Sequence, residues 1–337
     1  MAVDNQNLRL TASEITNLWT AYMNDSGAIC QLKYFEEKCE DTDIKPIIQH
    51  AIALSQSHLD KITEIFNGDN YPVPYGFKIE EDVDLTAGRL FSDVFVLYYL
   101  EHLGILGLNT YSMSLPYSPR EDVHTFFSEC LAESDQLLKQ AKDVLLEKGV
   151  YNKGSYLSTP DEVDFVKKQN FLSGYFGDKR PLTGPEITNL NGNYQRNALG
   201  TAMLIGFSQV ANKKEVREFC VRGKEIAQKH CDIFSSILSE SDVNVPSSFE
   251  TEVTDATTYV FSDKLMMYYT TTLIAVGVAY YGASMSMSPR RDLVVQYDRL
   301  LHEILLYAED GAELMIKHGW LEEPPRALDR DELAKKK

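Results

Sequence analysis

The strongest constraint in this sequence is an internal repeat. The segment LTASEITNL at 10–18 returns as LTGPEITNL at 182–190, a shift of 172 residues. The register continues through three further motif pairs, the last two at a shift of 170: VPYGF at 73–77 with VPSSF at 245–249, FSD at 91–93 with FSD at 261–263, and SPRED at 118–122 with SPRRD at 288–292. One two-residue gap in about 140 aligned residues indicates a tandem duplication.

Each copy has the residue spacing of long helices. Apolar residues recur three and four positions apart over stretches of about 25 to 30 residues, with short polar or Pro/Gly segments between them. In the SPR motif, Ser118 and Ser288 are expected to cap the fourth helix of each copy, with proline at its first position. The pattern predicts helices near 11–40, 43–67, 84–111, 119–148, 183–211, 213–239, 254–283 and 289–318.

The connections between these segments indicate the fold. The link between the second and third helix of each copy is longer than the others and contains the VP-x-x-F motif. Four long helices with one long connection are typical of a ferritin-like bundle. We therefore predict an all-α fold, a tandem duplication of two ferritin-like four-helix bundles at 10–150 and 182–320. Residues 151–181 are expected to form a partly ordered linker whose VDFVKKQNF and GYFG pieces pack on the bundles, and residues 321–337 a C-terminal tail.

Charge and apolar content restrict the partners and the compartment. The 337 residues include 33 basic and 50 acidic side chains, a net charge of −17, which disfavours nucleic acid and anionic membrane surfaces as partners. The uncharged segment from Leu265 to Pro289 is long enough to span a bilayer, but Glu101 and His102 in its counterpart favour a buried bundle helix. Five cysteines without a CxxC pair, and an N-terminus unlike a signal peptide, predict a cytoplasmic protein.

Each long helix has one polar residue on its apolar stripe. Bundle proteins build core sites from such inward-facing residues. With a rise of about 1.5 Å per residue, the four positions in each copy fall at similar depth. The predicted polar layers are Asp25, His58, Asp93 and Glu133 in the first copy, and Asn197, His230, Asp263 and Glu303 in the second.

Buried carboxylates in such a layer need compensation. A divalent transition metal would supply it, and one imidazole with several carboxylates suits iron, manganese or zinc. The alternative is a metal-free network in which protonated carboxyls share hydrogen bonds with neighbouring tyrosines. A dimetal centre is disfavoured, because the single Glu-x-x-His pair, Glu121 and His124, is replaced by Arg291 and Val294 in the second copy.

Several motifs in the sequence resemble those of a known protein family. The runs VDFVKKQNFLSG, GDKRPLTGPEITNL, GKEIAQKH, FSDKLMMYY, SPRRDL and GWLEEPP resemble domain-of-unknown-function 3231, which occurs mainly in spore-forming Bacillus-like bacteria. The resemblance spans roughly residues 10–330. It implies a tandem pair of ferritin-like bundles, some members being labelled spore coat-like. It brings neither an established reaction nor site residues.

Three functional hypotheses follow. The first is a structural or interaction role in spore-forming bacteria, with spore association and with homo-oligomer or spore-coat partners. The second is a bundle that binds one transition metal per domain and could be redox-active. The third is a small-molecule binder that uses the tyrosine-lined core. The sequence contains no glycine-rich phosphate loop, GxSxG motif or HExxH motif, so it does not decide whether the protein is an enzyme. Fold alone does not choose among the three hypotheses.

Overall fold

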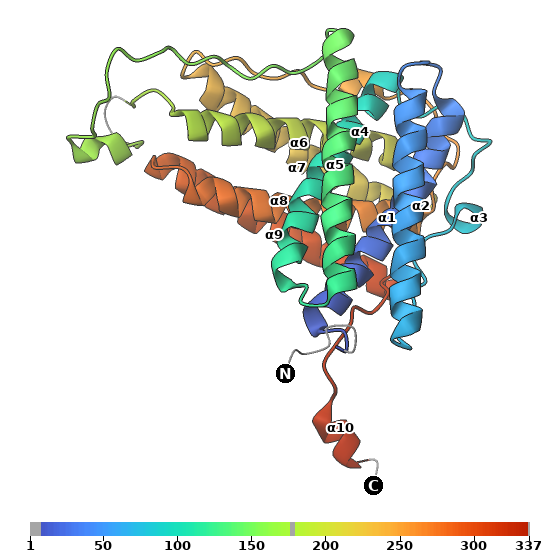
Figure 1. Cartoon of the computed structure of the whole chain (residues 1–337). Coiled ribbons are helices and arrows are strands. Elements are labelled where there is room, and N and C mark those ends of the chain that lie inside the picture. The colour runs from blue at the N-terminus through green and yellow to red at the C-terminus, as the bar shows by residue number, and fades with distance from the viewer. Residues whose placement is uncertain (1–7, 176–178, 336–337) are drawn as a thin grey trace.

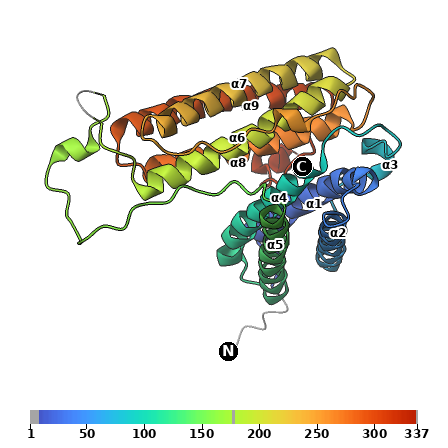
Figure 2. The same cartoon turned by 90° about the horizontal axis from the view of Figure 1, so that it is seen from above.

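The computed structural model describes residues 8–175 and 179–335, and this part of the chain forms two four-helix bundles. It contains no β-strand, only two isolated β-bridges. The all-α prediction and the tandem duplication are thus confirmed. In Figure 1 the first bundle stands upright and the second lies across it, and Figure 2 shows the same steep crossing from above. The bundle helices are α1 (Ala12–Lys38), α2 (Lys45–Gly68), α4 (Asp93–Ser114), α5 (Glu121–Glu147), α6 (Gly184–Val210), α7 (Lys214–Ser239), α8 (Asp263–Ser286) and α9 (Arg291–Lys317).

The long connection of each bundle lies between its second and third helix, as predicted. Residues 69–92 join α2 to α4 through the short helix α3 (Ile79–Asp82). Residues 240–262 join α7 to α8 through one 3-10 turn, Glu250–Glu252. The remaining turns within each bundle are short, so α1 pairs with α2, α4 with α5, α6 with α7 and α8 with α9. A relationship to the ferritins stays a prediction.

The predicted start of the third helix was wrong in both copies. The sequence pattern places it at 84 and 254, whereas α4 begins at Asp93 and α8 at Asp263. The preceding residues form turns and irregular backbone that pairs with the other copy: the Ser92 N–H donates to Glu252 O at 2.9 Å, and the Ser262 N–H donates to Asp82 O at 2.8 Å. These two hydrogen bonds are equivalent under the repeat, so the connection of each bundle contacts the third helix of the other.

Two glutamates explain why the LTxxE motif recurs. Glu14 forms a capping box with Thr11, and its second carboxylate oxygen accepts the Arg120 backbone N–H at 3.0 Å. Glu186 repeats this arrangement with Thr183 and the Arg290 N–H. Both glutamate residues are fully buried. Each carboxylate therefore joins the start of the first helix in its bundle to the start of the fourth.

The SPR motif works differently from the prediction. Helices α5 and α9 begin one residue after the arginine, so the proline lies outside the helix. The Ser118 hydroxyl donates to Ser114 O at 2.9 Å and Ser288 to Ser284 O at 2.7 Å, at the end of the preceding helix. Serine is thus bonded backward in the chain and does not cap the helix that follows.

The interdomain linker packs on the bundles only in part. Val163, Phe165 and Val166 of VDFVKKQNF are 86%, 78% and 63% exposed, so this piece does not pack on the bundles. Of GYFG, Gly174 is buried against Asp292 of α9, Tyr175 is exposed, and residues 176 and 177 lie outside the described residues. Figure 1 shows the linker running out to one side of the bundles. The exact domain limits stay a prediction.

The C-terminal tail contacts the first bundle before it ends in the exposed helix α10 (Arg330–Lys335), which projects away from the bundles in Figure 1. The Glu322 carboxylate accepts the backbone N–H of Tyr75 at 3.0 Å and that of Gly76 at 3.1 Å. Gly76 has φ +61°, and a Cβ there would lie 2.6 Å from the Ser26 hydroxyl oxygen. This bend is therefore accessible to glycine and not to residues with a side chain.

We expect Gly76→Ala to lower the free energy of unfolding by about 2 kcal/mol, from the left-handed backbone and the contact with Ser26. Urea denaturation of the full chain measures the change. Gly88→Ala is the matched control, because a Cβ at Gly88 meets nothing within 4 Å and its φ is not positive. Equal stabilities for the two variants would contradict the role of this bend.

In the described part of the chain, no helix is both long and apolar enough to cross a bilayer. The uncharged segment beginning at Leu265 forms most of α8, where Leu265, Met266 and Met267 are fully buried. This agrees with the prediction of a bundle helix.

Candidate metal centre

The first bundle places His58 between two carboxylates. His58 projects from the apolar face of α2 and is 6% exposed. Its Nε2 lies 2.9 Å from Glu133 Oε2 on α5, and its Nδ1 lies 3.2 Å from Asp25 Oδ2 on α1. The rings of Tyr111 and Phe126 contact the imidazole edge-on, so the ring is fixed by packing as well as by hydrogen bonds. Three of the four residues predicted for this layer thus come together.

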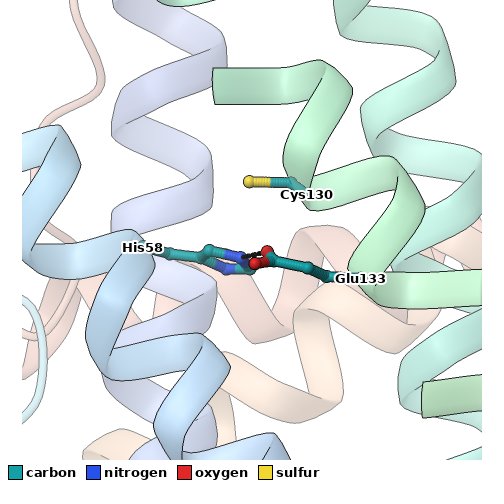
Figure 3. Close-up of side chains that lie close together, drawn as sticks. All are labelled: His58, Cys130 and Glu133. Atoms are coloured by element: carbon teal, nitrogen blue, oxygen red, sulfur yellow. Dashed lines mark hydrogen bonds and ion pairs between the residues drawn. The ribbon is translucent and has the colours of Figure 1, made fainter. Parts of the chain in front are cut away.

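Cys130 completes the cluster and was missed by the sequence analysis. It precedes Glu133 by three residues on α5, so both side chains lie on one face of the helix. The donor atoms of His58, Cys130 and Glu133 all lie within 4.8 Å of one another. Figure 3 shows His58 and Glu133 facing each other, with the Cys130 sulfur one turn away on the same side of α5. One difference in the sequence distinguishes Cys130: at the matching position the second copy has the apolar Leu300.

The neighbouring groups in this cluster and their burial shift the pKa values of His58 and Cys130. Burial by itself lowers the pKa of His58, but the Asp25 carboxylate and the hydrogen bonds to Asp25, Cys130 and Glu133 raise it to about 12. Burial raises the pKa of the Cys130 thiol to about 11. Without a metal, the proton therefore lies on the His58 imidazole, between Asp25 and Glu133 and beside a neutral thiol, which differs from the predicted network of protonated carboxyls and tyrosines.

The donor set also fits a divalent metal. Metal-binding histidines commonly donate their second ring N–H to a carboxylate, and Asp25 on Nδ1 leaves Nε2 for the metal. A thiolate, an imidazole and a carboxylate suit Zn²⁺, and three protein ligands leave a fourth position open. A cavity of about 60 Å³ lined by Asp25, His58 and Ser134 adjoins the cluster. The Glu133 side chain is 34% exposed, which gives an entering ion a route from solvent.

Asp93 and Asp263 do not belong to these layers, and their prediction as core ligands was wrong. Each is the first residue of its helix, and neither is a hydrogen-bond partner of the histidine in its bundle. Asp263 accepts the backbone N–H groups of Asn212 and Lys213, both at 2.9 Å, and Asp93 accepts that of Asp41 at 3.0 Å and pairs with Arg89 at 2.6 Å. Because the third helices begin nine residues later than predicted, the assumed depth of both residues was shifted by more than two turns.

The second bundle has the histidine but not the donor set. His230 Nε2 lies 3.1 Å from Glu303 Oε2, while its Nδ1 lies 2.8 Å from the Tyr281 hydroxyl. Asn197 reaches His230 only through Tyr281, to whose oxygen its amide donates at 2.9 Å. Lys229 pairs with Glu303, and burial lowers the pKa of His230.

The predicted symmetry of the two layers is therefore lost. Leucine replaces Cys130 at the matching position, and Lys229 forms an ion pair with Glu303. In the described residues, His230 and Glu303 therefore belong to no group of three possible metal donors. The arrangement predicted as one metal per domain is reduced to a single candidate, in the first bundle.

Comparison with known proteins places the chain in a family. The family model described as "Protein of unknown function (DUF3231)" matches residues 1–163 and again residues 170–333. The chain belongs to this family. The two matches of DUF3231 correspond to the two copies of the repeat. No curated protein matches the chain.

Among solved structures, the chain is similar to a crystal structure from Bacillus halodurans that is provisionally described as a spore coat protein. The TM-score is 0.41 at 15% sequence identity, over 44% of this DUF3231 chain and 98% of the other chain. A structural role in spore-forming bacteria, with coat or oligomer partners, stays a prediction.

Proposed function

We propose that the first bundle binds one divalent transition metal, Zn²⁺ by its donor chemistry, through His58 Nε2, the Cys130 thiolate and a Glu133 oxygen. The observation that supports this is the approach of these three donors to within 4.8 Å of one another in a buried site. Asp25 holds the imidazole in the orientation that presents Nε2, and is a positioning residue. Binding replaces the His58 and Cys130 protons by the metal charge.

The repeat supplies an argument from within the chain. A buried cysteine that served packing alone could be leucine, as it is at position 300. In the first bundle, however, the thiol lies beside a histidine and a glutamate that lacks a lysine partner, since the position matching Lys229 is Ser57. Each difference between the bundles favours a cation in the first and a hydrogen-bonded network in the second.

The test is metal binding by the full chain, purified without an affinity tag. We expect one Zn²⁺ per chain after equilibration and dialysis, and one Co²⁺ on substitution, with the intense absorption of cobalt–thiolate coordination. Cys130→Leu, which copies the second bundle, should lose the thiolate absorption and bind at least 100-fold more weakly. Asp25→Asn should weaken binding about 10- to 100-fold, as losses of such supporting carboxylates do.

Cys231→Ala is the matched control, because Cys231 is also a buried thiol and adjoins the histidine of the second bundle. It should leave stoichiometry and affinity unchanged. Circular dichroism of each variant verifies that the helices are retained. A chain that takes up no stoichiometric metal, or a Cys130→Leu variant with full affinity, would refute the proposal.

A further inference from the structure

A second cavity adjoins the one beside the candidate metal centre, with which it shares the lining residues Asn24, Ala28, Leu103 and Leu106. It has a volume of about 190 Å³ and opens between the core of the second bundle and helices α1 and α4 of the first. Its walls are mostly apolar, with Leu103, Met203, Ile226 and Ile274 among them. Leu273 lines it and is 38% exposed, which marks its mouth. No acidic side chain of the described residues lines the cavity.

One cation faces this apolar space. The Arg196 guanidinium stacks on the Tyr280 ring at 3.6 Å and donates one hydrogen bond, from Nη2 to Asn193 Oδ1 at 2.8 Å. Among the described residues, no carboxylate lies within 4.0 Å of it. Burial lowers the pKa of Arg196, and the residue is half-buried. His102, also in the wall, has its pKa lowered to about 4 by burial and is neutral. Arg196 is thus a charge without a counter-ion.

The surroundings of Arg196 hold it in place. The Asn193 amide donates to the Ser284 hydroxyl at 2.8 Å and to the Tyr297 hydroxyl at 3.4 Å, which directs its carbonyl oxygen to the arginine. Tyr280 is in turn fixed by Asn109 from α4 of the first bundle, whose amide donates to its hydroxyl at 2.6 Å.

The first bundle has no counterpart of this network. The positions matching Asn193, Arg196, Tyr280 and Tyr297 are Ala21, Asn24, Thr110 and Phe127. Four neighbouring positions therefore differ together between the copies, and their difference places one oriented guanidinium on an apolar cavity. Packing alone does not need this arrangement, because the first bundle packs the same positions without it.

We infer that this cavity binds a small monocarboxylate with an apolar tail, whose carboxylate pairs with the Arg196 guanidinium. A carboxylate accepts two parallel N–H bonds from a guanidinium and supplies the missing counter-charge. The tail fills the space between Leu103, Met203 and Ile274. A cavity of about 150 Å³ accommodates benzene, so this larger one fits a tail of about six to eight carbons. This inference is independent of the metal proposal.

Octanoate is the probe, titrated into the full chain by calorimetry in 0.15 M salt, where the net charge of −17 is screened over about 8 Å. We expect saturable binding of one octanoate per chain. Octanamide, which has the same tail without the charge, should bind at least 10-fold more weakly. Arg196→Asn, which copies Asn24 of the first bundle, should weaken octanoate binding at least 10-fold and leave octanamide binding unchanged.

Two further variants separate the charge from the space. Gly200→Leu should abolish binding of both probes, because Gly200 lines the cavity and its Cβ would project into open space. Arg299→Asn removes an exposed arginine of the same bundle and should change neither affinity. Circular dichroism and thermal melting establish that each variant folds. Absence of octanoate binding up to millimolar concentration would overturn the inference, as would equal octanoate affinity in Arg196→Asn or equal affinity for the two probes.

Discussion

Replacing Glu186 with alanine is expected to lower the free energy of unfolding by about 3 to 5 kcal/mol, because it breaks a buried, charge-paired network. The Glu186 carboxylate accepts the Thr183 N–H at 2.8 Å and the Arg290 N–H at 3.1 Å. Its two oxygens also accept Arg180 Nη1 at 2.8 Å and Nη2 at 2.9 Å. Alanine would leave the guanidinium and the two helix-start N–H groups without their acceptor. Urea denaturation followed by circular dichroism measures the loss.

The first bundle offers the matched variant, Glu14→Ala. Glu14 has the same threonine and arginine backbone partners, but among the described residues no guanidinium lies within 4.0 Å of it, since the position that matches Arg180 is Leu8. We expect a smaller loss, about 2 to 3 kcal/mol, from the unsatisfied N–H groups. Equal losses in the two variants would show that the Arg180 pair contributes nothing. A loss below about 1 kcal/mol in both would contradict the structural role of the motif.

The second large effect is a pH dependence that arises from Glu101. This residue is 6% exposed on α4, and burial raises the pKa of its carboxyl from 4.5 to about 7, with Lys142 acting in the opposite direction. The adjacent His102, 4.0 Å away, is neutral at pH 7 because burial lowers its pKa to about 4, so it offers no charge. At the matching position the second bundle has Thr271, whose hydroxyl donates to its own helix at Met267 O.

The sign follows from proton binding. Between pH 4.5 and about 7 the folded chain holds a proton on Glu101 that the unfolded chain has lost, so Glu101 makes stability fall as pH rises through this window. The difference of about 2.5 pH units corresponds to about 3 kcal/mol. Glu101→Gln should therefore be more stable than the unmodified chain by about 3 kcal/mol at pH 8 and by little at pH 4.5.

Chemical denaturation of both proteins at several pH values between 4.5 and 8 measures the difference between their free energies of unfolding. The contributions of groups that titrate in both proteins cancel in this difference. Glu129→Gln is the control, because Glu129 is exposed on α5 and its replacement removes the same charge. Its stability should follow that of the unmodified chain across the range. Parallel curves for Glu101→Gln and the unmodified chain would contradict a raised pKa at Glu101.

Much of the candidate site could be predicted from local pattern. His58, Asp25 and Glu133 interrupt apolar stripes at helical spacing, and each stripe faces the bundle core because nothing else buries it. Their approach then follows from helix rise and short connections. Cys130 escaped this reasoning because a thiol on an apolar stripe is indistinguishable from packing until its neighbours on other helices are known. The structure supplied those neighbours.

The prediction of Asp93 as a core ligand was wrong because of a contact between the two copies. The residues before it are apolar enough to continue the helical pattern, but their backbone groups bond to the other copy of the repeat. A pairing between Ser92 and Glu252, 160 positions apart, leaves no trace in local spacing, so the helix start was placed nine residues too early. That error moved an aspartate from a helix end into the core, where its charge appeared to need a metal.

The sequence by itself determined the duplication, the helices and the motifs that join them, because periodic burial and capping are written in residues close together along the chain. The tertiary structure decided what depends on contacts between distant residues: the crossing of the bundles, the different surroundings of His58 and His230, and the cavity that Arg196 faces. Two copies of one pattern gave two different interiors, because a few changed side chains redirect a buried hydrogen-bond network without altering the helices that hold it.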